Sequence, residues 1–265
     1  MSISWRAYRR ARRRSRQAWI ILAGLAVAGI LGLGWFFTDG QFALAEPSVA
    51  GPTEVRVFDA EWMKPVTAVH PVPDSKAAEV LDVLAVKGRA PNNAYSREKF
   101  GQAWYDVDRN GCDTRNDILR RDLTAIEFTR NSTCGVAAGT LVEPYTGKVV
   151  AFQRGAETSR EVQIDHVVAL SDAWQKGAQA LTPAQRQGLA NDPLNLIAAD
   201  GDANQQKGAG DTATWLPKNK SIRCHYVARQ ISVKAAYGLW VTQAEKDAMK
   251  RVLSSCPDQR TVGAA

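Results

Sequence analysis

The stretch EVQIDHVVAL (residues 161–170) places Asp165 and His166 side by side within an apolar run that has the composition of a β-strand. The chain has three histidines, the other two being His70 and His225. A histidine beside a carboxylate at the end of a strand is a candidate general base. In most proteins such a histidine is simply buried in the core, where the neighbouring carboxylate accepts a hydrogen bond from its imidazole. The pair alone therefore does not assign a function.

Two polar elements follow this strand. The short apolar run NDPLNLIA (191–198) is typical of a return strand, and DGDANQQKG (200–208) leads into a helix. A histidine has the near-neutral pKa that suits a general base, and carboxylate and amide oxygens hold a hard divalent cation better than they hold zinc. The sequence offers an acid, a base, two amides and a cation in this order: Asp165, His166, Asn195, Asn204 and Lys207.

These motifs resemble the HNH nuclease family, whose active site is a ββα-metal finger. The chain is most similar to the secreted actinobacterial nucleases that share the nuclease domain of GmrSD-type restriction enzymes. Their D-H-V-x-x-L-x-x-A-W and A-N-x-x-K-G elements are matched by 165–174 and 203–208. In the family, the last active-site position of the motif is often a histidine. It is Asn204 here, a variant that keeps an oxygen ligand.

The resemblance implies a role for each motif residue. His166 would be the general base, and Asp165 and Asn204 would hold one divalent metal, Mg²⁺ first, with Mn²⁺ or Ca²⁺ as alternatives. Asn195 would hydrogen-bond across the loop that holds the base. Lys207, three residues after Asn204 on the same helix face, is expected to meet a substrate phosphate, although a solvated lysine would fit the spacing too. Adjacent residues of a regular strand point to opposite faces, so the strand must end or bulge at this pair.

A second polar stretch, DVDRNGCDTRND (106–117), resembles a calcium loop. Oxygens stand at positions 1, 3 and 5, a glycine at 6 and an acid at 12, which gives the possible ligands Asp106, Asp108, Asn110 and Asp117. The alternative is a polar turn held by Cys112. The related nucleases share an N-G-C-D/N-T-R element here, which implies that the loop belongs to the nuclease fold and brings Arg115 toward phosphate.

Four cysteines indicate disulfides in an exported protein: Cys112, Cys134, Cys224 and Cys256. They allow three pairings, of which the nearest-neighbour pairing closes two moderate loops. A zinc site is the alternative, but the chain has no C-x-x-C motif and no clustered histidines.

The N-terminal part predicts export. Residues 1–17 hold seven arginines and no acid, and 18–37 is a twenty-residue apolar run without charge, which is long enough to span a membrane. The arginines place the N-terminus in the cytoplasm and the remainder outside. Cleavage of a signal peptide after Ala45, at an A-x-A site formed by Ala43 and Ala45, is the alternative to a membrane anchor. Both interpretations put the fold outside the cytoplasm.

The net charge of +7 resides in that tail. Without the seven arginines, the remaining Lys and Arg equal the 27 Asp and Glu in number. Within the fold, 207–260 is rich in cations, including Lys218, Lys220 and Arg223, and would attract a polyanion.

The sequence therefore predicts an α+β protein with a ββα-metal nuclease core, flanking helices and a β-hairpin. Its expected parts are a basic tail (1–17), a transmembrane or signal segment (18–37), a linker (38–53) and a nuclease domain (54–265) with its site core at 161–215. Expected elements include a strand within 54–62, a helix from the N-cap Asp74 to Gly88, a helix at 96–104, a strand at 123–128 and a hairpin at 139–152. Further helices are expected at 172–180, from the N-cap Thr182, at 221–236 and from the N-cap Thr242.

We expect a monomeric, metal-dependent HNH endonuclease that cuts DNA, or RNA, with little sequence specificity outside the cytoplasm. A second, structural Ca²⁺ in the loop at 106–117 would be consistent with this. The alternative is a catalytically inactive nucleic-acid- or calcium-binding surface module of the same fold.

Overall fold

The structure is a computed structural model that describes residues 68–156 and 158–263. The basic tail, the apolar run, the linker and the strand expected at 54–62 lie outside these residues. Within the described part, no helix combines the length and the apolar character that crossing a membrane requires.

Three antiparallel strands form the first sheet in the order β1-β2-β3, with β1 at Leu123–Phe128, β2 at Val136–Val142 and β3 at Val149–Gln153. The expected strand at 123–128 and the expected hairpin are confirmed. The turn of the hairpin is built around buried Glu143, whose carboxylate accepts from the backbone amides of Tyr145 at 2.8 Å and Thr146 at 2.7 Å. This turn places the Tyr145 side chain in the interior, where it is fully buried.

The second sheet is an antiparallel pair, β4 (Val162–His166) and β5 (Leu196–Asp200), in which His166 pairs with Leu196. Helix α6 (Gly201–Lys207) follows β5 without a loop, because the side chain of Asp200 caps it by accepting from the Ala203 amide at 2.8 Å. A Cβ at Gly201 would lie 2.1 Å from the Arg160 carbonyl oxygen, so only glycine permits this close approach of α6 to the start of β4.

The helices surround these two sheets. The α-helices are α2 (Ala77–Val83), α3 (Thr114–Asp122), α4 (Leu170–Gln175), α5 (Pro183–Asn191), α7 (Arg223–Ala236) and α8 (Gln243–Leu253). Short 3₁₀ turns are η1 (Arg97–Phe100), η2 (Thr158–Arg160), η3 (Ala178–Ala180) and η4 (Lys220–Ile222). The predicted caps of α5 and α8 are confirmed, since Thr182 forms a capping box with Gln185 and Thr242 accepts from the Glu245 amide.

Two expected helices and one stretch expected as a loop differ from the structure. The helix expected at 96–104 is only the single turn η1. Helix α2 begins after Lys76, and the expected cap Asp74 instead pairs with Arg260. Helix α3 begins at Thr114, inside the stretch that the sequence indicated as a loop, because Asp113 caps it by accepting from the Asn116 amide at 2.9 Å.

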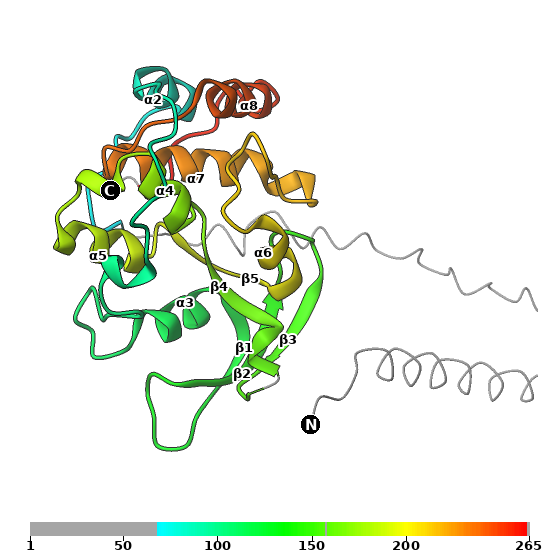
Figure 1. The fold of residues 1–265 in the computed structure, drawn as a ribbon. Helices are drawn as coiled ribbons and strands as arrows, with labels where there is room; N and C mark the ends of the chain where they lie inside the picture. The colour runs from blue at the N-terminus through cyan, green and yellow to red at the C-terminus, as the bar shows by residue number, and fades with distance from the viewer. Residues whose placement is uncertain (1–67, 157, 264–265) are drawn as a thin grey trace, which may run out of the picture. The chain divides into compact units, whose positions relative to one another are not determined.

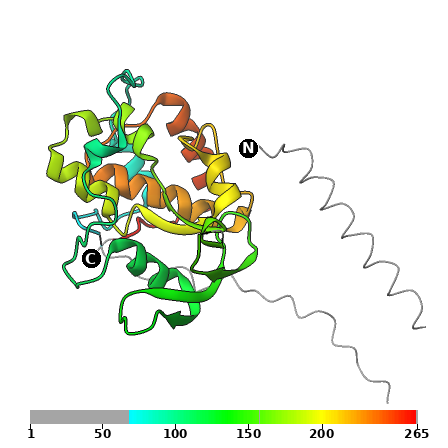
Figure 2. The ribbon, with the colours of Figure 1, turned by 60° about the horizontal axis from the view of Figure 1, so that its bottom comes forward.

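Helix α7 runs through the middle of the fold, with α2 and α8 on one side and the strands on the other (Figures 1 and 2). The larger hydrophobic core lies among these helices and includes Ile197 and Ala199 of β5. The smaller core lies between α3 and the sheets and includes the alternate residues Leu196 and Ala198. Strand β5 is therefore buried on both faces, which fixes its partner β4 and the residues at the end of β4.

A buried group of ion pairs joins the helical elements. The ammonium of Lys176, which is fully buried, lies 2.7 Å from carboxylate oxygens of Asp172, Asp211 and Glu245. Lys234 pairs with Glu245 at 3.0 Å. Several charged residues that we expected at the surface are therefore buried in ion pairs. As a result, the cation-rich segment 207–260 exposes fewer cations to solvent than its composition predicts.

Candidate active site

The end of β4 delivers two functional side chains to one pocket. Asp165 and His166 are 6% and 8% exposed, and both line a pocket of about 290 Å³ together with Asn204. The strand ends at His166, and the Val167 amide then donates to the Asn195 carbonyl at 2.8 Å. Because the strand ends here, adjacent residues reach one pocket, as the sequence required.

His166 is held as a neutral imidazole. Its Nε2 lies 2.9 Å from the Ala190 carbonyl oxygen, which can only accept, so the proton resides on Nε2 and the lone pair on Nδ1. Burial lowers the pKa of His166 to about 4, against the hydrogen bond to Ala190 and the charge of Asp165, which raise it. A neutral imidazole with an unprotonated Nδ1 is the form that can accept a proton.

Asp165 is held by two donors. The Tyr145 hydroxyl donates to its Oδ2 at 2.7 Å, and the Lys207 ammonium lies 3.0 Å from Oδ2 and 3.1 Å from Oδ1. Lys207 also donates to the His166 carbonyl oxygen at 2.8 Å. Tyr145 was missing from the sequence prediction, because it stands in a turn and belongs to no catalytic motif.

The position of Lys207 corrects the expectation that it meets a substrate phosphate. The residue is 3% exposed, and its ammonium binds Asp165 and the His166 carbonyl instead. Lys207 therefore orients the carboxylate and the end of β4, and its charge is already compensated within the protein.

Asn195 stabilises the chain that follows His166. It is fully buried; its Oδ1 accepts from the Val168 amide at 2.8 Å, and its Nδ2 donates to the carbonyls of Val168 at 3.3 Å and Leu189 at 3.2 Å. This geometry agrees with the expected structural role across the loop. Loss of Asn195 would displace His166 rather than remove a reacting group.

Asn204 presents an amide oxygen to the pocket from α6. Its Nδ2 donates to the Gln163 side-chain oxygen at 2.8 Å, which leaves Oδ1 as the atom that can meet a ligand. A carboxylate and an amide oxygen on one pocket are the donor types that Mg²⁺, Mn²⁺ and Ca²⁺ prefer. These two residues therefore fit a divalent metal with room for water and phosphate oxygens, and Asp165 would have to share its carboxylate with Lys207 and Tyr145.

Arg115 does not line this pocket. Its guanidinium lies over the Trp104 ring, 5.9 Å from the ring centre, and burial together with the charge of Arg154 lowers its pKa. The family-based expectation that Arg115 approaches phosphate therefore finds no support in the geometry, since the side chain is packed on an aromatic ring.

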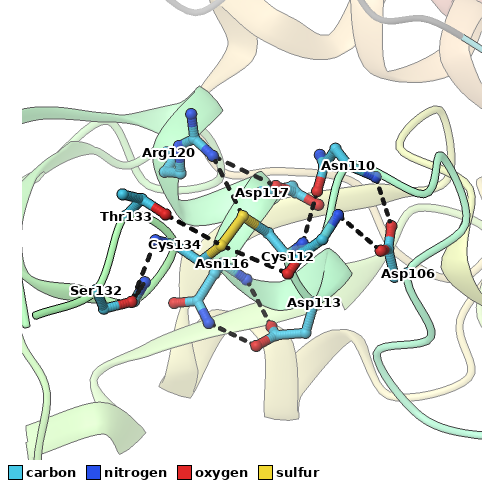
Figure 3. Close-up of a disulfide and its surroundings, with 12 residues drawn as sticks. Asp106, Asn110, Cys112, Asp113, Asn116, Asp117, Arg120, Ser132, Thr133 and Cys134 are labelled. Atoms are coloured by element: carbon cyan, nitrogen blue, oxygen red, sulfur yellow. Dashed lines mark hydrogen bonds and ion pairs between the residues drawn. A yellow bond between two sulfur atoms is a disulfide. The ribbon is translucent and has the colours of Figure 1, made fainter.

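The loop at 106–117 forms a polar turn that the Cys112–Cys134 disulfide joins to the segment before β2 (Figure 3). Asp106 accepts from the amides of Asn110 at 3.1 Å and Gly111 at 2.9 Å, and Asp108 accepts from the Asn110 side chain at 3.0 Å. Within residues 68–156 and 158–263, no group of three or more His, Cys, Asp or Glu side chains is arranged to hold a metal ion. The Asp106 and Asp108 carboxylates both accept from the Asn110 amide, so their oxygens stabilise the loop itself, and a calcium ion held by Asp106, Asp108, Asn110 and Asp117 stays a prediction.

Both disulfides have the nearest-neighbour pairing. Cys112–Cys134 joins the start of α3 to the loop between β1 and β2, and Cys224–Cys256 joins the start of α7 to the segment after α8. Two disulfides fit an exported protein.

Comparison with known proteins agrees with the motifs. The family model described as GmrSD restriction endonucleases, C-terminal domain, matches residues 113–252. A protein of Arthroderma benhamiae described as an uncharacterized secreted protein is 37% identical over 195 residues, which cover 72% of this chain and 91% of that protein. No solved structure matches the chain significantly. The relative is fungal, so these matches give the family but not the actinobacterial branch that the motifs indicated. The chain belongs to the family of GmrSD restriction endonuclease C-terminal domains.

Proposed function

We propose that the protein is a metal-dependent endonuclease that hydrolyses phosphodiester bonds in DNA, with RNA as a second substrate to be tested, outside the cytoplasm. The observation that carries the proposal is that Asp165, His166 and Asn204 line one pocket, with Nδ1 of His166 free of a proton. In this proposal β4, β5 and α6 are the two strands and the helix of a ββα-metal site.

The reaction follows from these groups. Nδ1 of His166 accepts a proton from a water molecule, whose oxygen forms a bond to phosphorus as the ester oxygen departs with the electron pair and takes a proton from solvent. A divalent metal held by Asp165 and Asn204 would supply charge stabilisation for the phosphate and the leaving oxygen. Lys207 and Tyr145 keep the Asp165 carboxylate in place.

The alternative is an inactive nucleic-acid-binding module of the same fold, and one observation favours it. The charge of Asp165 is already compensated by Lys207, at 3.0 Å, before any metal binds. Metal-dependent cleavage separates the two functions, because an inert module would bind nucleic acid in the presence of EDTA and never cut it.

The test is nicking of supercoiled plasmid by the full-length protein, and by residues 46–265, with Mg²⁺, Mn²⁺ or EDTA. His166→Ala should lower the rate by about 10²–10⁴ without changing the fold. Arg251→Ala, an exposed residue of α8, serves as the matched control. Wild-type protein that never cuts with either metal, or a His166→Ala variant as active as wild type, would refute the proposal.

A further inference from the structure

Arg97 stands at the same pocket and belongs to no motif of the sequence. It opens η1, is exposed, and is the one cationic side chain among the residues that line the pocket of Asp165, His166 and Asn204. It also lines a smaller, mostly apolar pocket of about 30 Å³ together with His166. Arg97 therefore flanks the proposed base.

The charge of Arg97 is available to a ligand. Within the described ranges no hydrogen bond or ion pair engages its guanidinium. The other two cations considered for phosphate, Lys207 and Arg115, are committed to Asp165 and to the Trp104 ring.

The turn that carries this arginine is fixed to α5. Phe100 is 2% exposed in the larger core, and the Arg186 side chain donates to the Lys99 carbonyl at 2.9 Å. Gly101 has a φ of 76°, and a Cβ there would lie 3.0 Å from the Gln187 side chain, so glycine allows η1 to pack closely on α5. The fixed turn holds the backbone from which the Arg97 side chain extends, so the ordering cost on binding is confined to that side chain.

We propose that Arg97 is a catalytic residue that binds the scissile phosphate and stabilises the negative charge that develops on its non-bridging oxygens. A guanidinium presents a planar pair of N–H donors to phosphate oxygens and does not lose its proton. The proposal rests on the proposed function and adds a group to it. Arg97 lies before residues 113–252, so the segment that precedes the matched domain would complete its active site.

Single-turnover cleavage by the full-length protein tests this role with two substrates, plasmid DNA and the small diester bis(p-nitrophenyl) phosphate. Arg97→Ala should lower kcat/KM by about 10²–10³ on both substrates, because the lost contact is with the reacting phosphate itself. Arg97→Lys should recover part of the rate, since it restores the charge without the bidentate geometry. Arg251→Ala should match wild type, and thermal melting of all three variants should stay at the wild-type temperature.

Two outcomes of the cleavage assay would overturn the proposal. Arg97→Ala as active as wild type would remove it from catalysis, and a loss on plasmid alone would make it a general DNA contact. If wild type cleaves neither substrate, the proposed function fails, and anisotropy of a short DNA duplex in EDTA still decides the phosphate contact. In that assay Arg97→Ala should reduce the slope of log K against log salt by about 0.9, whereas an unchanged slope rejects the contact.

Discussion

Replacement of Lys207 by methionine removes one charge from a buried pair and keeps the length of the side chain. The Lys207 side chain is 0% exposed and that of Asp165 is 7% exposed, with 3.0 Å between the charged groups. Removing one partner of such a pair costs about 3–5 kcal/mol, because the other charge stays buried without compensation. The Tyr145 hydroxyl still donates to Asp165 at 2.7 Å, which favours the lower part of that range.

For a folded part of this size, each kcal/mol shifts the melting temperature by about 2–4 °C, so Lys207→Met should lower it by about 6–20 °C. Calorimetry in EDTA measures this shift. Lys250→Met is the matched control, because Lys250 forms an ion pair of 2.7 Å with Asp82 at the surface, where both side chains are more than half exposed. The control should melt at nearly the wild-type temperature.

The double variant Asp165→Asn/Lys207→Met completes the test. It removes both charges and should be more stable than Lys207→Met alone, since no isolated charge stays buried. If Lys207→Met melts at the wild-type temperature in EDTA, the conclusion that the buried ion pair between Lys207 and Asp165 stabilises the fold is refuted.

Divalent metal supplies a separate readout on the same variant. If Asp165 is a metal ligand, Mg²⁺ restores the missing positive charge and should raise the melting temperature of Lys207→Met more than that of wild type. Equal shifts in both proteins would reject Asp165 as a ligand while leaving the ion pair intact.

The remaining predictions concern pH, an anchoring hydroxyl and a disulfide. The pKa of His166 is about 4 in the folded protein and 6.5 in the unfolded chain. Between pH 6.5 and pH 4 the unfolded state therefore binds more protons than the folded state. The free energy of unfolding should fall by about 3 kcal/mol as the pH is lowered through this range. Urea unfolding in EDTA should show this loss in wild type and a flatter profile in His166→Gln. Tyr145→Phe should lower the free energy of unfolding by about 1.5–3 kcal/mol, because it removes a hydrogen bond to the charged Asp165 carboxylate. It should also raise the Mg²⁺ concentration needed for activity. An unchanged metal dependence would count against a role of Tyr145 in holding Asp165. The cysteines of the Cys224–Cys256 disulfide are 32 residues apart. Its reduction should lower the free energy of unfolding, measured by thermal melting, by about 3–4 kcal/mol. The double variant Cys224→Ser/Cys256→Ser should no longer respond to reductant at this site.

The local features of the site were predictable because residue type and spacing encode them. The Asp165-His166 pair at the end of an apolar strand indicated a base beside a carboxylate, and the three-residue spacing of Asn204 and Lys207 placed both on one helix face. The same spacing could not tell which side chain would be buried. The structure turns Asn204 to the pocket and buries Lys207 beneath Asp165.

Other members of the site left no signal in the sequence. Tyr145 comes from a hairpin turn and Arg97 from a single 3₁₀ turn, and both meet the end of β4 only through long-range packing. Arg115 is a further case, because the motif that predicts its contact with phosphate gave no sign that its guanidinium would lie over the Trp104 ring.

By itself the sequence determined what depends on near neighbours: the strand at 123–128, the hairpin, the helix caps at Thr182 and Thr242, and the parity of the four cysteines. A cap or an alternating strand is stabilised by residues a few positions away, so its pattern is legible in a short window. Only the tertiary structure decided which charges would be compensated in the interior, as with Lys176 among three carboxylates and Lys207 against Asp165. The physical reason is that the free energy of a charge is set by its burial and its partners, which lie far apart along the chain.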